Sequence, residues 1–287
     1  RDAVKTHASM DLLLNHATQQ AVTGLAHNDI PVLILKGTAL AHLHYPEPYL
    51  RTRCDTDLYI RKDDRHAVAR VMEGMGYGIT GFDTRRNSSR QFGAGRVSAA
   101  GAPVQFDIHW KLSNRVLFVD TLLFEEAWRD RQSIPALGKD AWAPCDADLL
   151  YHACIHRIAH GRGTERNRLI WLYDIHLLWN ALDEKGKQAF VEKALAKKIG
   201  AVCADALQVC EELFEPPARR SDVSRDPSAN SGRDSRRSYR EELRKNRKKE
   251  PTAPLINAGK PRWAWADLVA TKGLGKKLAF AKELLFK

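Results

Sequence analysis

The hydrophobic pattern changes its period along the chain, and this change limits the possible folds more than any other feature. Between residues 31 and 110, apolar residues form short runs or alternate with polar ones, which is typical of β-strands. Between residues 146 and 214 they follow the spacing of amphipathic helices. We therefore predict an α+β protein, in which a small mixed β-sheet with flanking helices is followed by a helical bundle.

Local patterns place the individual elements. An apolar run at 32–35 and alternating segments at 55–60, 91–98 and 104–110 predict strands, and the last two are joined by a small-residue turn that favours a hairpin. Helical periodicity, with Gly or Asp residues at several ends, predicts helices at 6–25, 39–45, 65–75, 146–160, 167–182, 187–198 and 201–214.

Composition divides the chain further. We expect an N-terminal helix at 1–27, an α/β domain at 28–135 and a helical domain at 136–215. Residues 216–262 are rich in Arg, Ser, Asp, Asn and Pro and contain few apolar residues, a composition that buries too little surface to offset the entropy of ordering. They predict a basic flexible linker, and residues 263–287 predict an amphipathic helical segment.

Charge is concentrated in the predicted linker. Residues 216–262 hold 14 Lys and Arg against 6 Asp and Glu, a surplus of 8 out of the total net charge of +11. Contact with nucleic acid through residues 219–249 is one interpretation, and a solvated linker is the other. Tyr239 is the single aromatic residue there, so sequence-specific recognition of single strands is disfavoured.

Other classes of protein are excluded by what the sequence lacks. No apolar run approaches the roughly 18 residues of a membrane span, and residues 1–7 show no signal-peptide core. The five cysteines form no CxxC pair, which argues against a disulfide framework or a cysteine zinc site and favours the cytoplasm. GxSxG, P-loop and GxGxxG motifs are also absent, so hydrolase, P-loop and Rossmann interpretations have no support.

Three carboxylates are the strongest candidates for chemistry. Asp55 and Asp57 flank Thr56 on a predicted strand, so their side chains share one face, about 6–7 Å apart along it. Asp107 lies on a later predicted strand. Oxygen ligands of this kind suit Mg²⁺. A second pair, Asp146 and Asp148, precedes a helix, where such residues commonly favour the helix N-terminus.

A second group is less specific. His152, His156 and His160 recur every four residues on one predicted helix face, which is compatible with a metal or phosphate, but packing is the favoured interpretation. Asp174 lies within an apolar helix and predicts a structural ion pair with another helix.

The sequence also resembles a known family. Its residues Leu33–Leu40, Tyr45, Arg51, Asp55–Leu58 and Phe106–Trp110 are similar to the uncharacterised bacterial nucleotidyltransferase-like family of the polymerase-β-type superfamily. Leu149–His160 and Arg168–Ile175 resemble the helical part of that family, so the resemblance covers about residues 31–182. The chain departs from the superfamily pattern in having Thr38 in place of Ser, Lys36 before the glycine, and a longer gap from Gly37 to Asp55.

The resemblance implies a function. Asp55, Asp57 and Asp107 would be the catalytic carboxylates and would hold two Mg²⁺ ions, while Lys36, Gly37, Thr38, Arg51 and Arg53 would contact the nucleotide. The reaction implied is transfer of a nucleoside monophosphate from an NTP, with ATP expected, to a hydroxyl group of a protein, RNA, sugar or small molecule, with release of pyrophosphate. The alternative is a non-catalytic protein of the same fold that binds nucleic acid or a protein partner through its basic tail.

Overall fold

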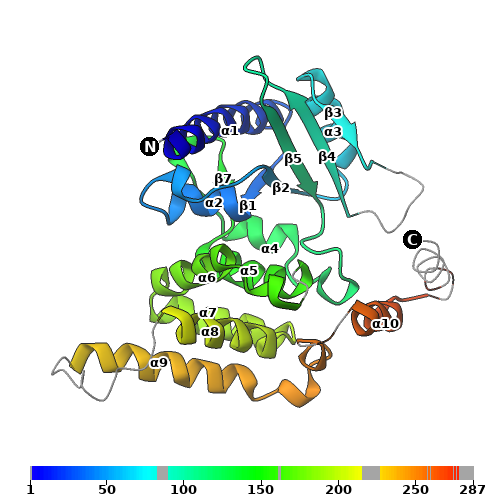
Figure 1. Cartoon of the computed structure of the whole chain (residues 1–287). Helices are drawn as coiled ribbons and strands as arrows, with labels where there is room; N and C mark the ends of the chain where they lie inside the picture. Colours follow the sequence, from blue (N-terminus) through cyan, green and yellow to red (C-terminus); the bar gives the residue numbers. More distant parts are fainter. Residues whose placement is uncertain are drawn as a thin grey trace. The chain divides into compact units, whose positions relative to one another are not determined.

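The computed structural model describes residues 2–82, 90–160, 163–214, 227–256, 258, 260–273, 275 and 277. The chain divides into two compact units (Figure 1). Unit 1 comprises residues 1–114 and 119–145, and unit 2 comprises residues 115–118 and 146–287. Unit 1 combines a sheet with helices and unit 2 is helical, which confirms the predicted α+β class.

The sheet of unit 1 has five strands in the order β1-β2-β5-β4-β3. Its strands are β1 (Val32–Leu35), β2 (Thr56–Ile60), β3 (Gly78–Thr80), β4 (Gln91–Val97) and β5 (Pro103–His109). Strand β2 is antiparallel to β1 and parallel to β5, and β4 is antiparallel to β5. Every residue of β1 and β2 is buried, so a charged side chain on β2 has to find a partner inside the protein.

Helices surround this sheet. They are α1 (Asp2–Ala26), α2 (Lys36–Leu43), α3 (Arg65–Gly74) and α4 (Phe124–Arg129), with 3₁₀ turns η1 (Pro48–Leu50) and η3 (Pro135–Leu137) and a small second sheet of β6 (Gln132–Ser133) and β7 (Trp142–Ala143). Helix α1 buries Leu14, Ala21 and Leu25 along one face. Helix α2 follows β1 without a loop, so its first turn lies at the end of a buried strand (Figure 1).

Unit 2 is built from α5 (Asp146–His160), α6 (Leu169–Ala181), α7 (Glu184–Ala196), α8 (Gly200–Phe214), α9 (Pro227–Arg244) and α10 (Lys260–Ala270). Short 3₁₀ turns are η2 (Val116–Phe118), η4 (Gly163–Asn167), η6 (Arg247–Lys249) and η7 (Ala253–Leu255). Its core includes Tyr151, Ile155, Ile175, Leu178 and Phe190. None of the helices in the described part of the chain is long and apolar enough to cross a membrane.

Helix α9 contradicts one prediction. The sequence indicated a flexible linker over 216–262, but residues 227–244 form a helix that packs on α7 and α8. Leu243 is fully buried, Arg236 donates a hydrogen bond to the Asn180 side chain at 2.6 Å, and the Tyr239 hydroxyl donates to Glu184 at 2.9 Å. A few well-placed contacts thus order a segment of low mean hydropathy.

The rest of the predicted linker and tail is divided between described and undescribed residues. Glu250, after α9, accepts a hydrogen bond from the Ala201 amide at 2.7 Å and so caps the start of α8. In the predicted C-terminal segment, Trp263 of α10 packs on Phe118 with ring centroids 5.8 Å apart. Residues 215–226 and 278–287 lie outside the described residues.

Candidate functional site

The pairing of β2 with β5 brings two of the predicted carboxylates together. In the parallel register Asp57 lies opposite Asp107, and Tyr59 lies opposite His109. Because side chains alternate along a strand, Asp107 and His109 point to the same face of β5. One potential ligand atom from each of Asp57, Asp107 and His109 lies within 4.8 Å of the others. Elsewhere in the described ranges, no three His, Cys, Asp or Glu side chains converge in this way.

His109 is a residue of this site that sequence reasoning missed. The available signal was its position two residues after Asp107 on an alternating strand. Its significance depends on β5 lying beside β2, which no local pattern reveals.

Asp57 is the most buried of the three aspartates, and two side chains of the protein contact its carboxylate. It is 6% exposed, and its Oδ1 accepts hydrogen bonds from Lys36 Nζ at 2.5 Å and from His109 Nε2 at 2.8 Å. Burial acts to raise the pKa of Asp57, but Lys36 and His109 outweigh it and hold that pKa well below the usual range. Asp57 is therefore ionised at neutral pH, and both contacts fall on one of its oxygens.

Lys36 reaches Asp57 from an unfavourable backbone conformation. Its φ is 49°, in the left-handed region, at the junction of β1 and α2. A side chain in this region costs about 1 kcal/mol or more relative to glycine. Strain of this kind persists when the side chain performs a task that glycine cannot, and the task visible here is the contact with Asp57.

Asp55 experiences the opposite electrostatic balance. It directly precedes β2 and is partly buried. Burial, followed by the negative charges of Asp57 and Asp107, raises the pKa of Asp55, and the more weakly acting Lys36 and His109 do not cancel this effect. Burial, followed by the charge of Asp55 and the weaker effects of Asp57 and Asp107, raises the pKa of the Cys54 thiol. Burial and nearby carboxylates thus both disfavour the ionised form of Asp55.

We call Asp55, Asp57 and Asp107 the acidic cluster. The first turn of α2 adjoins it through Lys36, which contacts Asp57. A Cβ on Gly37 would lie 3.5 Å from Cζ of Arg51, so the Arg51 guanidinium rests against this turn. Arg51 is 8% exposed and donates a hydrogen bond to the Thr52 carbonyl at 2.8 Å. The Thr38 hydroxyl lies instead inside the protein, 3.3 Å from the hydroxyl of Thr56, and Thr38 is 1% exposed.

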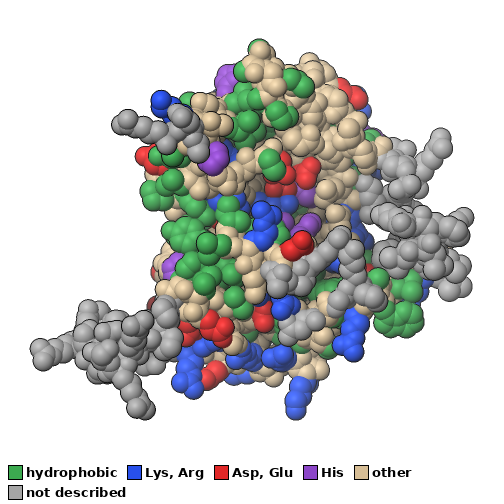
Figure 2. Space-filling view, viewed as in Figure 1, with side chains coloured by type: hydrophobic (Ala, Val, Ile, Leu, Met, Phe, Trp, Pro, Cys, Tyr) green, Lys and Arg blue, Asp and Glu red, His purple; other side chains and the backbone are tan. Residues whose placement is uncertain are grey.

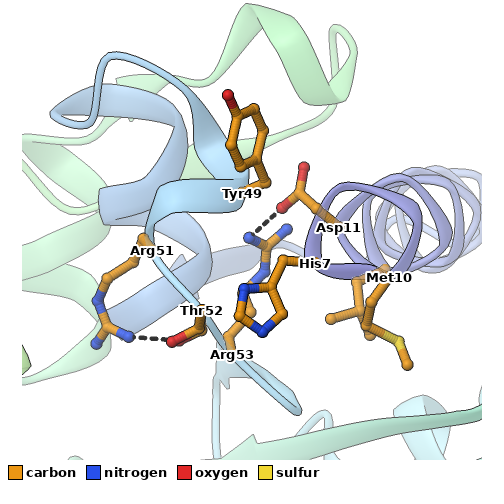
Figure 3. A pocket seen from close by; sticks show the side chains of 8 residues that line it. His7, Met10, Asp11, Tyr49, Arg51, Thr52 and Arg53 are labelled. Carbon is orange, nitrogen blue, oxygen red and sulfur yellow. Dashed lines mark hydrogen bonds and ion pairs between the residues drawn. The ribbon is translucent and has the colours of Figure 1, made fainter. Parts of the chain in front are cut away.

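Arg53 lies apart from the carboxylate cluster. In the pocket of Figure 3 its guanidinium faces Asp11 of α1, and Nη1 contacts the Asp11 carboxylate at 2.5 Å. It also donates to the Asn15 side chain, which lies 2.9 Å from Nε2 of His42. Burial and the Arg53 charge lower the pKa of His42 to about 4. Arg53 therefore ties the segment before β2 to α1.

The other sequence candidates lie in unit 2. His156 stacks on His160 with ring centroids 4.4 Å apart and meets the Trp171 ring edge-on at 4.8 Å, which matches the favoured packing interpretation. Asp146 and Asp148 lie in the first turn of α5, as expected for residues at a helix start, and Asp148 pairs with Lys193 of α7. Asp174 is buried within α6.

Comparison with known protein families identifies a match. A family model described as an uncharacterised nucleotidyltransferase matches residues 1–215, which include the five-stranded sheet, the three aspartates and helices α5 to α8. No curated protein matches the chain.

Proposed function

The chain belongs to this uncharacterised nucleotidyltransferase family, and on that premise we propose that it moves a nucleoside monophosphate from an NTP, with ATP preferred, to a hydroxyl acceptor. The observation that supports the proposal best is the convergence of Asp57, Asp107 and His109 at the paired strands β2 and β5. Family membership supports nucleotidyl transfer in general, and the site geometry supports the metal-dependent form of it.

The residues of the cluster fit a divalent cation. Carboxylate oxygens, such as those of Asp57 and Asp107, are hard ligands that suit Mg²⁺ or Mn²⁺. Burial, followed by the charges of Asp57 and Asp107, raises the pKa of Asp55, and a bound cation would oppose the effect of those two charges. A divalent ion bound here would withdraw charge from the triphosphate and stabilise the leaving pyrophosphate.

The chain's own groups account for the remaining needs of the reaction. Asp57 and Asp107 would hold the cation, with Asp55 at the edge of the same acidic cluster. Asp107, which is less buried than Asp57, would accept the proton of the acceptor hydroxyl as its oxygen bonds to the α-phosphorus. The bond from that phosphorus to the bridging oxygen then breaks, and pyrophosphate leaves.

The start of α2 is the proposed phosphate-binding element. The first amide groups of a helix lack partners within the helix and point toward a bound anion. Arg51 places a positive charge at this turn, where its guanidinium lies against Gly37, and Lys36 adds a second charge that is paired with Asp57. Thr38 would contribute its backbone amide, because its hydroxyl is directed to Thr56.

The non-catalytic alternative has one observation in its favour and one against it. Lys and Arg side chains, with acidic ones among them, gather over the region of α9 in Figure 2, and Lys245, Arg247, Lys248 and Lys249 are exposed after it. Against it, the convergence of Asp57, Asp107 and His109 within 4.8 Å at the sheet has no part in binding through the basic segment. We therefore favour the enzyme.

Calorimetry tests this proposal. We expect ATP to bind the protein in the presence of Mg²⁺ or Mn²⁺, and we expect Asp57→Asn and Asp107→Asn to abolish the metal-dependent part of that binding. Asp120→Asn is the matched control, because Asp120 is a 70% exposed carboxylate of unit 1 paired with Lys111. Absence of metal-dependent nucleotide binding in the unmodified protein would refute the enzyme proposal, and salt-sensitive RNA binding alone would favour the alternative.

A further inference from the structure

We propose that the Lys36 ammonium permanently fills one of the two cation positions of this site, so that the protein binds one divalent ion with its nucleotide instead of two. This inference rests on the proposed nucleotidyl transfer and specifies how the site is charged. One ammonium and one divalent ion would then take the place of the two Mg²⁺ ions that the family resemblance implies.

The first argument is the position of the ammonium. In a two-ion site, the carboxylates of adjoining strands share both cations. Here Asp57, the most buried of the three aspartates, directs Oδ1 at Lys36 Nζ, 2.5 Å away. His109 Nε2 lies 2.8 Å from the same oxygen. The side of Asp57 that holds Oδ1 is thus already occupied by donors that belong to the chain.

The second argument is what remains of the acidic cluster. Within the described residues, no hydrogen bond reaches Oδ2 of Asp57, so this oxygen and Asp107 are left for an ion. Asp55, Asp57 and Asp107 together carry three negative charges when ionised, and Lys36 supplies one positive charge. The two charges that remain are those which one divalent ion neutralises.

The third argument is the backbone. Three described residues other than glycine have a positive φ, and Lys36 is the one among them whose side chain contacts a carboxylate of the site. Lys36 occupies a backbone conformation that favours glycine, and its side chain is 19% exposed. A lysine serving only to attract nucleotide from solvent would not need a strained backbone or a buried partner.

The test counts bound ions. Mn²⁺ binding is followed by electron paramagnetic resonance in the presence of the non-hydrolysable analogue α,β-methylene-ATP. The main variant is Lys36→Gly, which removes the ammonium and suits the left-handed backbone. Lys36→Arg retains the charge. Lys198→Gly is the matched backbone control, because Lys198 is an exposed lysine of unit 2 with φ of 59°.

We expect one Mn²⁺ per chain in the unmodified protein, in Lys36→Arg and in Lys198→Gly, and two per chain in Lys36→Gly. Two ions in the unmodified protein would overturn the inference while leaving the proposed function intact. One ion in both the unmodified protein and Lys36→Gly would also overturn it, since the ammonium would then replace no ion. Absence of both Mn²⁺ and nucleotide binding in all four proteins would refute the proposed function and the inference with it. Circular dichroism confirms that each variant is folded.

Discussion

Replacing Asp57 with Asn, compared with the same change at Asp55, tests the electrostatic description of the acidic cluster without any substrate. The two carboxylates are separated by one residue, yet their surroundings act on them in opposite directions. Lys36 and His109 stabilise the charge of Asp57 against burial, whereas burial and neighbouring carboxylates disfavour the charge of Asp55. In metal-free protein, Asp57→Asn should therefore decrease the free energy of unfolding, and Asp55→Asn should increase it.

The size of the stability loss expected for Asp57→Asn follows from the burial of the Lys36–Asp57 ion pair. Removing one member of a buried ion pair costs about 3–5 kcal/mol. The Asp57 side chain is 8% exposed, but that of Lys36 is 19% exposed, so water partly solvates the ammonium left behind. The Asn oxygen also still accepts one hydrogen bond, so we expect a loss of about 2–3 kcal/mol. For Asp55→Asn we expect a gain of about 0.5 kcal/mol, the scale of interactions between partly solvated charges.

The pH dependence of the free energy of unfolding provides a second test of the opposite effects expected at Asp57 and Asp55. A carboxylate whose pKa is lower in the folded protein stabilises it above the unfolded value of 3.8, and this contribution is lost as the pH falls below that value. The pKa of Asp55 is raised, so its ionised form destabilises the folded protein. This destabilisation is present at neutral pH and disappears below pH 3.8. The loss caused by Asp57→Asn should thus be about 1 kcal/mol smaller at pH 3 than at pH 7.

Urea denaturation with EDTA, followed by circular dichroism at pH 7 and pH 3, measures these differences. Asp120→Asn again controls for the loss of one exposed charge in unit 1. Equal destabilisation by Asp55→Asn and Asp57→Asn would refute the reasoning, because it would mean that both residues act through packing. A loss at Asp57 that did not depend on pH would refute it as well.

Two further predictions concern residues outside the cluster. Arg53→Met should cost about 3 kcal/mol, since it leaves the buried Asp11 without its counter-charge, and Asp11→Leu in the same chain should restore most of that loss in urea denaturation. Equal losses in the single and double variants would contradict this ion-pair explanation. Glu250→Ala should lower the stability of unit 2 by about 1–2 kcal/mol because it removes the cap of α8. Faster hydrogen exchange at the first amides of α8 would show this, and unchanged exchange at Ala201 would count against it.

Patterns close in sequence were sufficient to predict most elements. The runs that indicated strands at 32–35 and 55–60 correspond to β1 and β2, and the helix expected at 146–160 is α5 with the same bounds. These predictions succeed because apolar periodicity directly reflects which face of an element is buried. The linker prediction failed over α9 for the same reason, since its ordering depends on a few contacts with other helices and not on its own composition.

The sequence by itself determined most of the strands and helices and the presence of acidic residues on two strands. Only the tertiary structure decided which charges meet. The parallel pairing of β2 with β5 places Asp107 and His109 beside Asp57, the junction of β1 and α2 adds Lys36, and α1 binds Arg53 away from them. Side-chain alternation is a local property of the chain, whereas strand neighbours and ion-pair partners depend on contacts between residues far apart in sequence.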